Sequence, residues 1–173
     1  MTTRKQRHKA YLDQHVKDEN GGYRYVGEWY RLQGGQARLY PFLALVLLTG
    51  AAVVASGCIT AAGLKNTWYV IFPYIIEVSL LFALAWQAVR LAVGRGSLKA
   101  FVFEEVSPRV RPLCGGLALA AAVSTVCAGI FVLRQGADGT ALACAAYFLL
   151  KAVTAAGALL ARKRYGDLVW QKG

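Results

Sequence analysis

Four long apolar stretches dominate the chain and limit what it can fold into. Two of them lie in windows without any charged residue, 39–64 and 112–133, each longer than the roughly 20 residues that an α-helix needs to cross a bilayer. The other two are equally apolar apart from Glu77, Arg90 and Lys151. The sequence therefore predicts an all-α membrane protein with four transmembrane spans. The predicted spans are residues 40–62, 68–93, 112–133 and 140–161.

The distribution of basic residues predicts how these spans are oriented. Seventeen of the 20 Lys and Arg residues lie in the N-terminal segment, in residues 90–111 or in the C-terminal tail, whereas the two short loops hold only Lys65 and Arg134. Cytoplasmic loops are enriched in Lys and Arg, so both termini and the middle connection are expected in the cytoplasm, around an antiparallel four-helix bundle. The predicted parts are a cytoplasmic segment, a transmembrane domain and a cytoplasmic tail, at 1–39, 40–162 and 163–173.

Glu77 and Lys151 are the charged residues that fall deep inside predicted spans, whereas Arg90 lies at the inner end of its span. A charge within the hydrocarbon region costs several kcal/mol unless it faces the protein interior and finds a partner there. We therefore expect Glu77 and Lys151 to form an intramembrane pair, either directly or through a polar relay that includes Tyr147 or Thr154. The alternative is that Lys151 extends its side chain to an interface.

The third span carries a row of small residues at intervals of four. The row favours close approach of another helix, because helices in lipid associate through small residues. Packing within the chain is the first interpretation, and homodimerisation through the same row is the second. This packing ridge consists of Gly116, Ala120, Ser124 and Ala128.

Aromatic residues cluster next to the first two spans. Trp68 and Tyr69 begin the second span, where such rings anchor a helix at the headgroup level. Trp29 and Tyr30 belong to the N-terminal sequence GYRYVGEWYRL, which predicts either a strand and turn or an amphipathic collar at the membrane face. A cytoplasmic partner protein bound to these aromatics is a further alternative.

The sequences GYRYVGEWYRL and NTWYVIFPYIIE together resemble a group of small four-span membrane proteins of gut clostridia. The resemblance extends over most of the chain. It implies a bacterial inner-membrane setting, but it implies no activity because none is known for that group.

The connection between the second and third spans predicts an interfacial helix. Ser97 can cap a helix over SLKAFVFEEV, whose apolar side chains would face lipid. Pro108 and Pro112 are expected to end this helix and redirect the chain.

The four cysteines all lie in apolar spans, and no CxxC pair is present. We expect them to act as small apolar packing residues, with no metal or cofactor bound. Residue counting puts three of them and Glu77 in the outer third of the bilayer, so a soft-metal or redox site is the alternative. The cysteines are Cys58, Cys114, Cys127 and Cys144.

These patterns favour a non-enzymatic accessory or interaction subunit of the cytoplasmic membrane. The alternative is a small proton- or cation-coupled transporter or channel that uses the Glu77 and Lys151 charges. An enzyme is disfavoured because no histidine, carboxylate pair or ligand cluster lies in the spans. The net charge of +11 follows from the positive cytoplasmic segments, and no recognition motif points to nucleic acid.

Overall fold

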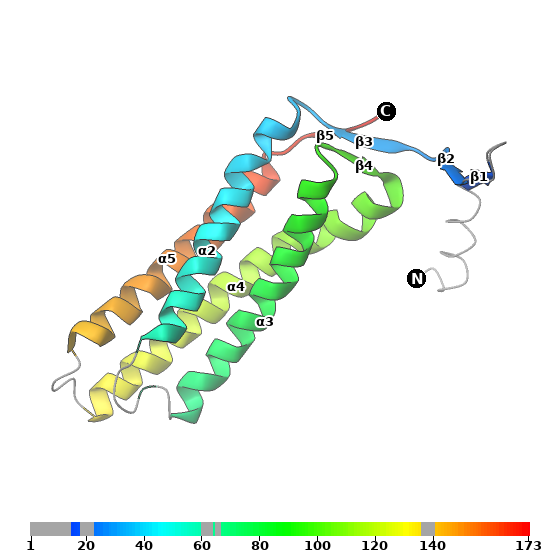
Figure 1. Cartoon of the computed structure of the whole chain (residues 1–173). Coiled ribbons are helices and arrows are strands. Elements are labelled where there is room, and N and C mark those ends of the chain that lie inside the picture. The colour runs from blue at the N-terminus through cyan, green and yellow to red at the C-terminus, as the bar shows by residue number, and fades with distance from the viewer. Residues whose placement is uncertain (1–14, 18–22, 60–63, 65–66, 136–140) are drawn as a thin grey trace.

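The computed structural model describes residues 15–17, 23–59, 64, 67–135 and 141–173. In this part of the chain, four helices are long and apolar enough to cross a membrane, which confirms the predicted class of protein. Figure 1 shows them side by side as a bundle. The helices are α2 (Tyr40–Cys58), α3 (Trp68–Val93), α4 (Ala100–Gln135) and α5 (Ala141–Gly166).

Each helix packs along one face and turns apolar side chains outward on the other. Helix α5 packs against α2 and α4, and α4 also packs against α3, while α2 and α3 contact each other less extensively. Large apolar residues face outward, including Leu47, Phe82 and Leu133. An apolar outer surface this extensive is unusual for a soluble monomer and suits a helix bundle surrounded by lipid.

A small antiparallel sheet lies at one end of the bundle (Figure 1), and it was not predicted as a unit. Its central strand β3 (Trp29–Leu32) pairs with β4 (Ser97–Lys99) on one side and β5 (Trp170–Lys172) on the other. The sheet thus joins the N-terminal segment, the middle connection and the C-terminal tail. A separate pair consists of β1 (His15–Lys17) and β2 (Tyr23–Tyr25).

The central strand is fixed by its ladder and by one buried side chain. Leu32 is buried in the main core, and its amide donates to the Gly96 carbonyl at 2.8 Å. Gly34 and Gly35 have φ angles of 82° and 72°, which residues with a side chain rarely adopt. They allow β3 to turn into the 3-10 helix η1 (Gln36–Arg38), which leads directly into α2.

The middle connection differs from the predicted interfacial helix. Ser97 lies in β4 rather than at a helix cap, and the helix that follows runs without interruption from Ala100 to Gln135. Pro108 and Pro112 lie inside it, so the prediction that they end a helix is wrong. Because the two prolines are four residues apart, the amide groups they lack fall on one side of the helix, which can bend there and continue. Figure 1 shows the first turns of α4 running at an angle to the remainder.

Candidate functional site

Glu77 on α3 and Lys151 on α5 meet in the interior of the bundle. The Lys151 Nζ lies 2.7 Å from the Glu77 Oε2, and both side chains are 0% exposed. The second carboxylate oxygen, Oε1, accepts a hydrogen bond from the Ser124 hydroxyl on α4. Three of the four helices therefore contribute to one polar cluster, formed by Glu77, Ser124 and Lys151, which we call the buried triad.

Helical periodicity explains why these side chains point inward. On α3 the residues Pro73, Glu77 and Leu84 are buried at intervals of four and seven, so they share one face. On α5 the buried residues Tyr147, Lys151 and Thr154 are separated by four and three residues, so they also share one helix face. The two charges therefore lie on the packed faces of their helices, away from lipid.

Two tyrosine rings surround the ammonium group of Lys151. Its Nζ lies 4.9 Å from the centre of the Tyr74 ring and 5.0 Å from that of Tyr147. Cations are attracted to the face of an aromatic ring, and the attraction grows when water is excluded. Tyr74 precedes Glu77 by three residues and so shares its helix face, a signal that the sequence interpretation had not used.

The predicted polar relay is not needed to join the two charges, because they touch directly. The Thr154 hydroxyl donates to the Leu150 carbonyl of its own helix at 2.9 Å. The Tyr147 hydroxyl is buried and lies close to the Ser124 hydroxyl. Tyr147 thus contributes its ring to the site, beside the Lys151 ammonium group.

The predicted packing ridge on α4 lies toward α3. Ala120, Ser124 and Ala128 are buried, and a side-chain carbon added at Gly116 would lie 3.5 Å from Leu80 of α3. The ridge is therefore occupied by a helix of the same chain along this part of its length. Ser124 is both a member of the ridge and the hydrogen-bond donor to Glu77, a second role that small size alone did not predict.

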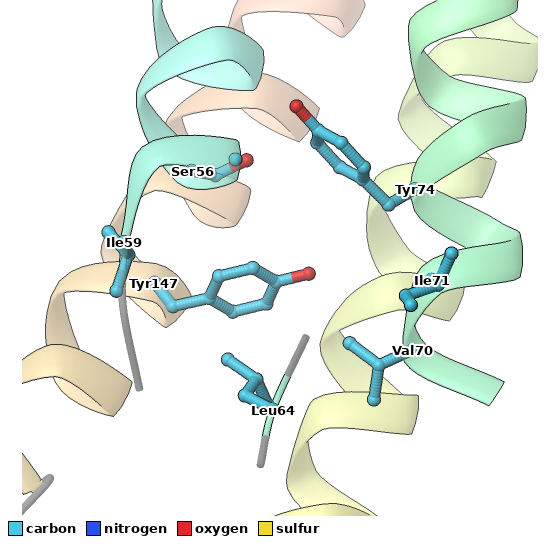
Figure 2. Close-up of a pocket in the computed structure, with 8 residues that line it drawn as sticks. Ser56, Ile59, Leu64, Val70, Ile71, Tyr74 and Tyr147 are labelled. Atoms are coloured by element: carbon cyan, nitrogen blue, oxygen red, sulfur yellow. The ribbon is translucent and has the colours of Figure 1, made fainter. Parts of the chain in front are cut away.

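A cavity of about 230 Å³ lies beside the buried triad, between the end of α2, the start of α3 and α5. Figure 2 shows Tyr147 reaching across from α5 toward α3, and Tyr74 reaching from α3 toward α2. Gly57 allows the second approach, because a side-chain carbon at this position would collide with the Tyr74 hydroxyl. The remaining lining is mostly apolar and includes Leu64 and Val70. The two tyrosine rings that flank Lys151 therefore also line this cavity.

The predicted interface anchors lie near the two ends of the bundle. Trp68 begins α3 with 79% of its surface exposed and packs edge-on against Tyr69. Trp29 and Tyr30 belong to β3, where Tyr30 stacks on Phe103 with ring centres 4.2 Å apart.

The cysteines lie at separate positions of the bundle. Cys114 and Cys144 are buried, Cys127 is partly buried, and Cys58 is exposed at the end of α2. Within the described residues, no group of three or more His, Cys, Asp or Glu residues is placed to hold a metal ion. The soft-metal alternative therefore gains no geometric support.

Comparison of the chain with protein families, characterised proteins and solved structures finds no similar protein. A carboxylate that is paired with an ammonium group and also accepts a hydroxyl hydrogen bond is well satisfied in an interior from which water is excluded. Such a cluster can hold three helices together, and it could exchange a proton only if water or an ion reached it.

Proposed function

We propose that this chain is a small non-enzymatic accessory or interaction subunit of a bacterial cytoplasmic membrane. In this proposal the four helices form an antiparallel bundle, and both termini lie in the cytoplasm. The split of basic residues between the two sides supports the orientation. The first turns of α4, which carry Glu104, Glu105 and Arg109, would lie at the cytoplasmic interface.

The observation that carries the proposal is the sheet β4-β3-β5. It gathers the three segments assigned to the cytoplasm into one folded surface, and its β3 strand presents Trp29, which is 36% exposed. A bundle that only needed to span the membrane would require no such surface. The buried triad suits this role, because it joins α3, α4 and α5 inside the bundle.

Topology can be tested with reporter fusions. Fusions at Gly173 should be active with a cytoplasmic reporter, and fusions in the 134–139 loop should be active only with a periplasmic one. The reverse pattern would contradict the proposed orientation. A photo-crosslinking amino acid at position 29 should then give one discrete adduct in native membranes, with either a second protein or a second copy, whereas position 68 at the opposite end serves as the control.

A transporter or channel is the second candidate, and the cavity beside Tyr74 and Tyr147 is the observation that favours it. Water or an ion in this cavity would approach Lys151 from one side of the bundle. Proteoliposomes decide between the candidates. Proton or cation flux that disappears in Glu77→Gln would support transport, whereas absence of flux in a correctly folded wild type supports a structural triad.

A further inference from the structure

A second hollow lies at the sheet end of the bundle, remote from the buried triad. It encloses about 530 Å³ between the end of α3, the strand β4 and the first turn of α4, with Trp29 of β3 at its edge. Among the described residues, its charged lining consists of Arg90 and Lys99, and no carboxylate lines it. We call it the interfacial groove.

The positive charge of this groove is only partly balanced by nearby carboxylates. Arg90 donates to the Glu105 Oε2 at 2.8 Å, but the same carboxylate also accepts from Arg109 at 3.2 Å, so two guanidinium groups share one negative charge. Lys99 forms no ion pair with the described residues, and its Nζ lies 4.9 Å over the ring of Tyr25. Glu28 and Glu104 also lie near Tyr25, but neither is among the described residues that line the groove, so the lining itself carries positive charge.

The remaining lining identifies what kind of anion fits. Trp86, Val89 and Val93 of α3 line the groove and are 62%, 54% and 75% exposed, so the groove continues onto the outer apolar face of a candidate membrane span. A soluble anion would leave these side chains uncovered. A molecule with a phosphate and an acyl chain would cover them and also reach Arg90 and Lys99. Tryptophan at the edge of a span is typical of the headgroup level of a bilayer.

We propose that the interfacial groove binds one anionic phospholipid. The phosphate lies between Arg90 and Lys99, near the Trp29 and Trp86 indoles, and one acyl chain follows α3 along Val89. The proposal requires that the bundle is inserted in a membrane, but it is independent of the orientation and of any protein partner. The lipid proposal can therefore fail while the proposed function stands, and the proposed function can fail while the lipid proposal stands.

Native mass spectrometry of the detergent-purified chain provides the test, with phosphatidylglycerol and phosphatidylcholine as probes. We expect one phosphatidylglycerol to be retained per chain, in preference to phosphatidylcholine. The variant Lys99→Gln should weaken phosphatidylglycerol binding about fivefold, since a cation near an anionic lipid surface contributes about 1 kcal/mol. The backbone pairing of β4 with β3 does not involve this side chain, so the variant should fold.

The matched control is Lys163→Gln, which removes an exposed cation of α5 that does not line the groove. This variant should retain phosphatidylglycerol like the wild type. Equal retention of both lipids, or equal losses in the two variants, would overturn the proposal. Displacement of the lipid by soluble glycerol phosphate at the same concentration would also overturn it, because the groove would then select an anion and not a lipid.

Discussion

Removing one member of the Glu77–Lys151 pair should destabilise the protein far more than removing both. At 2.7 Å, two unit charges attract each other by about 6 kcal/mol in a medium of effective dielectric constant about 20. The cost of taking both charges out of water offsets much of this attraction, so the pair as a whole stabilises the fold only modestly. Lys151→Met, however, leaves Glu77 fully buried with the Ser124 hydroxyl as its remaining partner in the triad. Leaving a buried charge unpaired typically costs about 3–5 kcal/mol.

Thermal unfolding in detergent measures this difference. For a chain of this size, 3–5 kcal/mol corresponds to a fall in melting temperature on the order of 10 °C. We expect such a fall for both Lys151→Met and Glu77→Gln, and recovery of most of the loss in the double variant. Thr154→Val is the matched control, because its hydroxyl donates within α5, to the Leu150 carbonyl, and its loss should cost about 1 kcal/mol.

The double variant Glu77→Gln/Lys151→Met decides whether the two charges are energetically coupled. If the losses of the single variants add in the double variant, the two charges are not energetically coupled, and the argument from burial and distance is refuted. If Lys151→Met melts like the wild type, the lysine is instead accommodated at an interface. Either result would also remove the basis for treating the buried triad as the element that holds three helices together.

Further substitutions test the packing around the triad. Ser124→Ala should lower stability by about 1.5–3 kcal/mol in the same melting assay, because it removes a hydrogen bond to a charged group. Ser124→Leu should cost more, since it also forces a large side chain between α3 and α4. Val123→Leu, on the exposed side of α4, should be nearly neutral. Gly157→Ala should destabilise the contact of α5 with α2, because the added methyl group would collide with Thr49. Gly129→Ala should be neutral or stabilising, since nothing lies within 4 Å of the added carbon and alanine favours the helix. A Gly157→Ala variant as stable as Gly129→Ala would contradict the packing of α2 on α5.

The four helices could be predicted because a bilayer imposes a length and a polarity that are visible in a single sequence. Glu77 and Lys151 could be singled out for the same reason, since each is an isolated charge in an apolar window. The contribution of Ser124 could not be predicted in this way. Its position on the small-residue ridge shows that a helix comes close, but which helix and which acceptor depend on how α3 and α4 are rotated against each other.

The continuous helix α4 was missed because proline was treated as a stop signal. That rule describes helices in water, where solvent can hydrogen-bond the backbone groups that proline leaves unpaired. Near a membrane the alternatives to a helix are more costly, so a helix with two missing bonds on one side bends and continues. Pro108 and Pro112 therefore mark a bend, and not an end.

The sheet could not be predicted because its strands are too short to show alternation, and because pairing partners lie far apart in the sequence. Strand β5 has three residues, and its register with β3 joins Leu32 to Trp170 across the whole transmembrane domain. A sheet of three strands needs a hydrophobic face or a helix to pack against to be stable in water. It is supported here because Leu32 and Leu98 are buried against the ends of the helices, and because Trp170 packs against Phe103 of α4. The sheet thus depends on the helices that it packs against. Substitutions in the buried triad should therefore loosen the sheet at the other end of the bundle, although they change no residue of the sheet.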